Sequence, residues 1–203
     1  MDLIFNNQIS IFEDILYKYL TPKQCTKLYT SNIILYNIFV DNNKFESNYY
    51  TPKTNRKLKE AVNIWYDNRK YAILKYGHIS YWNTKYIINM YSLFQDKDNF
   101  NDNISDWNTS NISSMANMFY NATNFNQNLN NWNMINISDM GFMFYNARNF
   151  NQDLNNWNLL SIRHIGYMFK NAINLNKSNY INWNMSNYYK VNSHIEDYNN
   201  MLY

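Results

Sequence analysis

The chain has 203 residues, a formal net charge of +3 and a 19% content of aromatic residues, which is ample core material for one elongated unit. The single Cys25 excludes an internal disulfide and is compatible with a reducing compartment. Polar residues interrupt the first 20 positions, at 6–8 and at Glu13 and Asp14. We therefore expect no secretory signal, no membrane span and a cytoplasmic location.

Residues 1–50 carry helix start signals and no long repeat. Capping boxes, in which a hydroxyl and a carboxyl or amide satisfy free N–H groups of the first turn, begin at Ser10 and Thr21. Pro22 occupies a first helical position, where its missing N–H costs nothing. These signals predict helices near residues 11–20, 22–30 and 31–39.

The stretch ISIFEDILYKYLTPKQCTKLYTSNIILYNIF resembles an F-box, the helical motif by which substrate receptors attach to a Skp-type adaptor of cullin ubiquitin ligases. Gln8 and Ile9 stand where that family usually begins with Leu-Pro, so the match is partial. A plain helical cap for the open end of a repeat array is the alternative. The resemblance implies an adaptor-binding surface that consists of Ile15, Leu16, Tyr19, Leu20, Pro22 and Leu28.

Residues 51–78 are predicted to form connector helices. Thr51-Pro52 opens one helix, and Gly77 is a natural stop for a second over residues 68–76. The first helix should bury one apolar face. That face consists of Leu58, Ala61, Val62 and Trp65.

Basic residues cluster in the same stretch, opposed only by Glu60 and Asp67. No base-reading motif or aromatic platform accompanies them, so we interpret them as a solvated helix surface and do not expect a nucleic-acid partner. The cluster consists of Lys53, Arg56, Lys57, Lys59, Arg69, Lys70 and Lys75.

From Ile79 onward the chain repeats every 25 residues. Each repeat is marked by a tryptophan, and the series is Trp82, Trp107, Trp132 and Trp157, with Trp183 following at 26. Each Trp brings apolar companions at fixed offsets, which in the second repeat are Ile104, Ile112, Met115, Met118, Phe119 and Phe125. Because one coil cannot hide its own core, the period predicts stacked coils. The fifth coil loses the Met-Phe pair, as a terminal cap commonly does.

Within a coil the spacing changes. Trp107 and Thr109 alternate with polar residues as in a short strand, whereas Ile112, Met115 and Phe119 have helical spacing. Ser113 and Ser138 are predicted to be N-caps of the helical segments. We therefore predict an α/β repeat fold, a leucine-rich-repeat-like β/α solenoid of about five 25-residue coils over residues 79–203, with an N-terminal α-helical region.

Strings such as FNQNLNNWNMINISDMGFMFYNARNFNQDLNNWN resemble the BspA-type leucine-rich repeats, a family found in cell-surface and giant-virus proteins. The resemblance covers residues 79–185. It implies a repeat solenoid used for binding and no chemistry, and a viral origin would place the protein in the host cytoplasm. Where the family usually has Asp after the Trp, this chain has Asn108 and Asn133, which disfavours a calcium ladder.

A partner-binding face is predicted on the outward strand positions. If Trp107 and Thr109 point inward, one outward row ends with apolar Ile135 and Leu160 beside rows of Asn. An exposed apolar pair of this kind would form a contact patch. The alternative is that both side chains tuck under the turn into the core. The predicted face consists of Lys85, Asn108, Ser110, Asn133, Ile135, Asn158 and Leu160.

Candidates for catalysis are few. The three histidines lack Cys, Asp or Glu at ligand spacing, and no glycine-rich phosphate loop is present. Asp96, Asp98 and Asp102 lack the Gly and the closing Glu of a calcium loop, so we interpret them as a solvated return loop. We predict no catalytic residue, no metal and no cofactor.

The sequence therefore favours a non-catalytic protein–protein interaction module. Its F-box-like start would make it a substrate receptor for a cullin ubiquitin ligase. The alternative is a structural or surface-adhesion repeat protein without a ligase link, which the missing signal peptide disfavours.

Overall fold

The computed structural model divides the chain into two compact units, Met1–Asn48 and Tyr49–Tyr203. It describes residues 50–180, 182 and 183, all of which belong to the second unit. The predicted helices between residues 11 and 39, and with them the F-box-like positions, lie outside the described residues. The elements in chain order are α3 (Asn55–Asp67), α4 (Arg69–Tyr76) and the short 3-10 turns η1 (Ile79–Tyr81) and η2 (Lys177–Asn179).

Helix α3 begins at a different cap from the one predicted. The hydroxyl of Thr54, and not that of Thr51, accepts the N–H of Lys57 at 3.2 Å and satisfies the first turn. The predicted apolar face is confirmed, because its four side chains are buried. They are Leu58, Ala61, Val62 and Trp65.

Helix α4 follows after a single residue. The side chain of Asn68 accepts the N–H of Tyr71 and so caps the second helix as the first one ends. Gly77, with φ 72°, ends α4 in the left-handed region, as predicted. Within the described part of the chain, no helix combines the length and the apolar character needed to cross a membrane.

The predicted β/α solenoid is wrong at the level of secondary structure. Residues 82–176 form neither a strand nor a helix. Strand-like pairing is limited there to isolated parallel bridges, and these fall in the segment predicted as helical. The bridges are Asn89–Ser114, Ser114–Asp139 and Asp139–His164.

Each coil is instead a succession of hydrogen-bonded turns. In the second coil the N–H of Trp107 donates to the carbonyl of Ile104 at 3.1 Å, and the N–H of Met118 donates to Met115 at 3.1 Å. A turn brings residues i and i+3 within about 7 Å of each other. Apolar residues three apart therefore point inward together, and their spacing imitates that of a helix.

Left-handed residues stop these turns from continuing as helices. Asn117 and Asn121 have φ of 56° and 57°, and six residues at equivalent positions of other coils share this conformation. Those six are Ser92, Asp96, Phe142, Asn146, Tyr167 and Asn171.

Alternate N–H groups then point to the following coil and form what we call the inter-coil ladder. In the second coil, Met115, Asn117 and Phe119 donate to the carbonyls of residues 139, 141 and 143 at 2.9, 3.0 and 2.8 Å. The predicted N-cap role of Ser113 and Ser138 is wrong, because no helix directly follows them in the described part of the chain and their hydroxyls do not accept a backbone N–H there. These hydroxyls instead donate to carbonyls of the preceding coil at 3.1 Å.

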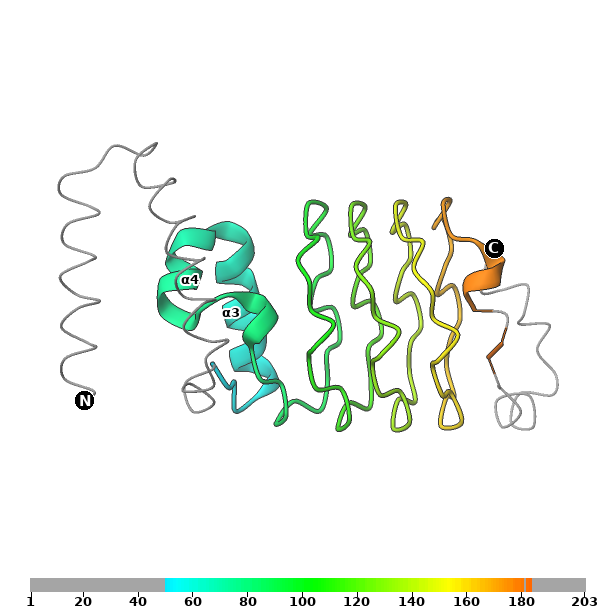
Figure 1. Cartoon of the computed structure of the whole chain (residues 1–203), viewed down its shortest axis with the longest axis horizontal. Helices are drawn as coiled ribbons and strands as arrows, with labels where there is room; N and C mark the ends of the chain where they lie inside the picture. The colour runs from blue at the N-terminus through cyan, green and yellow to red at the C-terminus, as the bar shows by residue number, and fades with distance from the viewer. Residues whose placement is uncertain (1–49, 181, 184–203) are drawn as a thin grey trace. The chain divides into compact units, whose positions relative to one another are not determined.

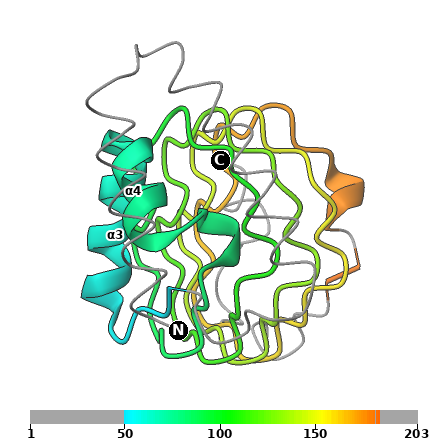
Figure 2. The same ribbon diagram turned by 60° about the vertical axis from the view of Figure 1, so that its left-hand side comes forward.

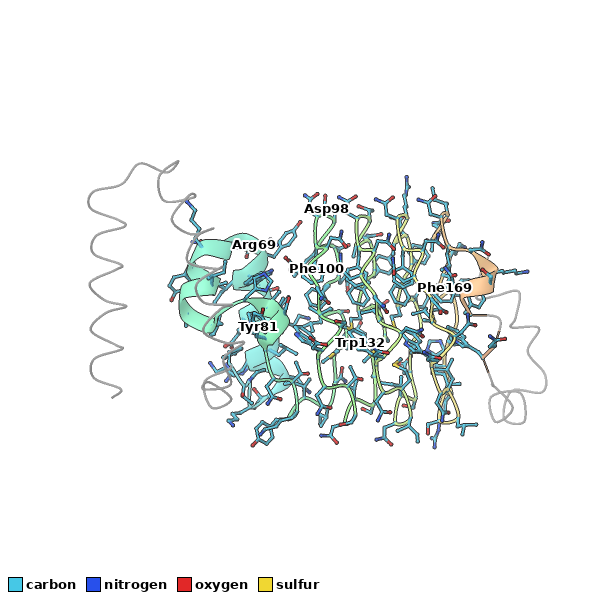
Figure 3. The ribbon with its side chains drawn as sticks, viewed as in Figure 1. Arg69, Tyr81, Asp98, Phe100, Trp132 and Phe169 are labelled. Carbon is cyan, nitrogen blue, oxygen red and sulfur yellow. The ribbon has the colours of Figure 1, made fainter. Side chains whose placement is uncertain are left out.

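The predicted core residues are buried between the coils, which lie side by side in Figure 1 and one behind another in Figure 2. Phe119 stacks on Phe94 and Phe144 with ring centroids 5.5 and 5.3 Å apart. The indole N–H of Trp132 donates to the carbonyl of Ile104 at 3.2 Å, so its polar edge is satisfied in the core. Phe100, Trp132 and Phe169 mark this interior in Figure 3.

Helices α3 and α4 cover the first coil. Trp65 packs edge-on against Trp82 at 5.9 Å, and its indole N–H donates to Asp102 at 2.8 Å. The carboxylate of Asp98 accepts the hydroxyl of Tyr66 at 2.6 Å. Asp98 is exposed, as the interpretation of a solvated loop predicted, but that interpretation is wrong for Asp102, whose side chain is 11% exposed and joins the helices to the repeats.

Candidate functional site

The apolar pair predicted for partner binding is exposed. Ile135 and Leu160 stand at the same turn of successive coils and are 46% and 39% exposed. Their neighbours Met134 and Leu159 fill the core positions of that turn instead, with at most 1% exposure. The alternative that the pair tucks into the core is therefore wrong.

We call Lys85, Ser110, Ile135 and Leu160 the turn row. Lys85 is exposed and Ser110 is half-buried, so all four predicted positions reach the surface. Along the row the side chains change from polar to apolar. The apolar half lies in the third and fourth coils.

The asparagines beside the turn row hold its backbone in place. The carboxamide oxygens of Asn108, Asn133 and Asn158 accept the N–H two residues ahead, at 3.0, 3.1 and 3.2 Å. An Asn that bonds its own backbone in this way fixes a turn. These three predicted site residues are exposed, but each also stabilises a turn of its coil, a role that the sequence did not predict.

Other asparagines are engaged between coils. The side-chain amide of Asn124 donates to Asn99 at 3.1 Å, and that of Asn149 donates to Asn124 at 3.1 Å. The carboxamide oxygen of Asn126 accepts the backbone N–H of Asn151 at 3.0 Å. Much of the polar surface is thus committed to the stack, which leaves exposed apolar and charged side chains as the groups most available for a partner.

An aromatic cluster on the inter-coil ladder was missed by the sequence analysis. Its rings form a chain of contacts. The ring centroids lie 4.7 Å apart in Tyr120 and Tyr145, 6.0 Å apart in Tyr145 and Phe142, and 5.2 Å apart in Phe142 and Tyr167. The ammonium of Lys170 lies 5.2 Å from the ring centre of Tyr167. The sequence contains a sign of the cluster, because Tyr120 and Tyr145, and likewise Phe142 and Tyr167, are 25 residues apart at positions of the repeat that do not belong to the core.

A second exposed apolar group lies at the first coil. Tyr86 and Ile88 are 48% and 59% exposed. The ammonium groups of Lys53 and Lys85 lie 4.2 and 5.1 Å from the ring centre of Tyr86. A cation over an aromatic face adds modest stabilisation at an exposed site.

A histidine and a carboxylate meet on the surface of the ladder. Nδ1 of His164 lies 2.9 Å from Oδ1 of Asp139, which also accepts the N–H of Gly141 at 3.0 Å. The imidazole occupies the space where a Cβ on Gly141 would lie. Among the residues the structure describes, no group of three or more His, Cys, Asp or Glu is arranged to hold a metal ion.

Titratable groups with shifted pKa values gather where the helices meet the first coil. Burial lowers the pKa of His78 and of Lys97, and the hydrogen bond to Asp98 raises the pKa of Tyr66. Burial raises the pKa of Tyr50 to about 12. Such shifts mark functional sites or structural networks. Here they accompany the packing of α3 and α4.

Comparison with known proteins identifies a family. The family described as "Mycoplasma protein of unknown function, DUF285" matches residues 62–183 and, in an overlapping stretch, residues 124–202. No curated protein and no solved structure matches the chain. The matched residues span most of the chain and contain the coils, which supports a BspA-like repeat protein. The chain therefore belongs to the DUF285 family.

Proposed function

We propose that this chain is a non-catalytic protein–protein interaction module whose partner binds the turn row. The observation that carries the proposal is the exposure of Ile135 and Leu160, at 46% and 39%, at equivalent positions of adjacent coils. Exposed apolar side chains flanked by polar ones are typical of contact surfaces. Asn108, Asn133 and Asn158 accept the backbone N–H groups of Ser110, Ile135 and Leu160 and provide the polar border of the row.

The pair alone would not hold a partner. Full burial of an Ile or Leu side chain contributes about 1.5–3 kcal/mol, and only 46% and 39% of the surface of these two residues remains to be covered. A stable interface covers about 800 Å² on each partner. The binding surface must therefore extend to further exposed groups, and Tyr86 and Ile88, which follow Lys85 of the turn row in the first coil, are available.

The aromatic cluster favours a protein over a nucleic acid. Tyr120 and Tyr145 stack with an angle of 6° between their rings, so each covers a face of the other. Stacking thus removes one face of each ring from those on which a nucleic-acid base could stack. Tyr is enriched at protein–protein contacts, and Tyr167 of the cluster is 38% exposed.

The F-box-like N-terminus extends the proposal to a substrate receptor. In that arrangement Ile15, Leu16, Tyr19, Leu20 and Leu28 would contact a Skp-type adaptor while the coils hold the substrate. The support for this part is the sequence resemblance alone. It is therefore tested separately from the turn row.

The turn-row proposal is tested by affinity isolation from the native cell with the tagged full chain. A double variant, Ile135→Lys with Leu160→Lys, is compared with a control, Asn131→Lys with Asn156→Lys, which adds the same charge at exposed neighbouring positions. We expect the wild type and the control to retain a common protein that the double variant loses. Recovery of the same proteins by all three chains would refute the proposal.

A further inference from the structure

The inter-coil ladder has a direction, and this leaves an edge at the first coil. Each coil donates its alternate N–H groups to carbonyls of the next, so Ser114, Ala116 and Met118 accept at 2.9, 3.0 and 2.9 Å. The corresponding carbonyls of the first coil belong to Asn89, Tyr91 and Leu93. Within the described part of the chain, no residue donates a hydrogen bond to these three carbonyls.

Helix α3 lies beside this edge without pairing to it. The side-chain oxygen of Asn55 accepts the N–H groups of Ile88 and Asn89 at 3.1 and 3.3 Å, which closes one end. Beyond Asn55, a groove of about 360 Å³ separates α3 from the edge, with Lys59 and Asn63 on the helix side and Tyr91 and Leu93 on the coil side. A helix uses its own backbone N–H groups internally, so it cannot complete the ladder.

The helix wall carries an available positive charge. Glu60 is paired with Arg56 and Lys57, each at 2.9 Å. Lys59 is exposed, and its ammonium group forms no ion pair with another described residue. A ligand of this groove would therefore meet a row of acceptors on one side and, on the other, the ammonium of Lys59 beside the Arg56–Glu60 ion pair.

We propose that this groove, which we call the edge groove, binds an extended segment of a partner protein. Alternate N–H groups of that segment donate to the carbonyls of Asn89, Tyr91 and Leu93, which adds one layer to the ladder. An acidic side chain of the segment pairs with Lys59. The site shares no residue with the turn row and does not rest on the function proposed for it.

The shape of the edge restricts which segments fit. Ser92 and Asp96 have φ of 52° and 58°, and the layers of the ladder repeat this conformation. A matching segment therefore favours Gly, Asn or Asp at the second of these two positions, where the coils have only Asp96, Asn121, Asn146 and Asn171. The first position also accepts an aromatic residue, as at Phe142 and Tyr167. A regular β-strand lacks this bend.

The test uses a synthetic peptide that copies residues 112–121 of this chain, whose Met115, Asn117 and Phe119 donate within the native ladder. A fluorescent form is titrated with the full-length protein. Methylation of the Asn117 amide removes a donor to Tyr91, whereas methylation of the Ser114 amide, which donates to no carbonyl of the ladder, is the matched control. We expect the first modification to weaken binding about ten-fold, which corresponds to about 1.4 kcal/mol and lies within the range for one lost hydrogen bond, and the second to weaken it far less.

Protein variants locate the bound peptide. Asn63→Trp fills the groove from an exposed helix position and should abolish binding, and Lys59→Glu should weaken the binding of a peptide extended by an acidic residue. Lys177→Glu, at the far end of the coils, is the control and should bind like the wild type. Thermal melting of each variant checks that it folds. Absence of binding to the wild type, or equal binding to the wild type and Asn63→Trp, would overturn the proposal.

Discussion

The indole N–H of Trp65 donates to the carboxylate of Asp102 at 2.8 Å, across 37 positions of sequence. The same carboxylate oxygen pairs with Arg69 at 2.6 Å, and the Asp102 side chain is only 11% exposed. One acidic residue thus holds both α3 and α4 against the first coil. The helical region and the repeats belong to one packed core.

We predict that Asp102→Ala lowers the free energy of unfolding by about 1.5–3 kcal/mol, because hydrogen bonds to a charged group are lost and the Trp65 N–H is left without a partner. Asp106→Ala, at an exposed position nearby, serves as control and should change it by less than about 0.5 kcal/mol. Urea unfolding of both variants measures these changes in the free energy of unfolding. Equal effects would show that Asp102 does not join the helices to the coil.

The tryptophan row should dominate the stability of the coils. Trp132 is 3% exposed and stacks near Phe119 at 6.4 Å. We predict a loss of about 3–5 kcal/mol for Trp132→Ala, from lost burial and the cavity left behind. Asn131→Ala, next to it and exposed, should be close to neutral. If thermal melting finds the two variants alike, the inward packing of Trp132 is not what stabilises the stack.

His78 should make folding sensitive to mild acid. Its pKa is lowered by burial, and it packs edge-on against Trp65 at 4.9 Å. In the unfolded chain it takes up a proton as the pH falls through about 6.5, while the folded state resists protonation. Its contribution to stability is therefore complete above that pH and decreases as the pH falls toward the lowered folded pKa.

We expect the wild-type melting temperature to decrease between pH 7 and pH 5, and His78→Asn to reduce that decrease. Asn is chosen because its side-chain oxygen can replace Nδ1 as acceptor of the Ser80 N–H. Melting curves across this range for both chains give the comparison. A slope with pH that is the same in both would assign the acid sensitivity to other groups.

The adaptor proposal predicts that the full-length chain binds a purified Skp-type protein at low micromolar concentration. Leu16→Asp with Leu20→Asp should abolish this binding, because charges would replace the apolar contacts that the F-box resemblance implies. Lys18→Glu, between them, is the control. Failure of the wild type to bind would end the ligase interpretation and leave the turn-row proposal untouched.

The inward residues were predictable because the 25-residue period is strict and each Trp fixes its coil. The secondary structure could not be predicted in the same way, since turns place Met115 and Met118 at the three-residue spacing that is also typical of a helix. Left-handed backbone at Asn117 gave no sequence signal, because Phe142 and Tyr167 adopt it in other coils. The apolar face of α3 was read correctly from its helical period.

The candidate site was only partly readable from the sequence. The change from polar to apolar residues along the turn row, at Ile135 and Leu160, is visible in the sequence because the adjacent rows are polar. Both side chains are exposed, as predicted. The role of Asp102 depends on a contact 37 residues away, which no local pattern contains. The aromatic cluster was overlooked because Phe142 and Tyr167 adjoin core methionines and were not separated from the core pattern.

A protein partner is proposed to contact the apolar end of the turn row. Site-specific photo-crosslinking in the native cell tests it most directly, with p-benzoylphenylalanine placed in separate full-length chains at position 135, 160, 131 or 156. We expect a discrete crosslinked protein from positions 135 and 160 and little from 131 and 156. Equal crosslinking at all four positions, or adducts from 131 and 156 alone, would contradict it.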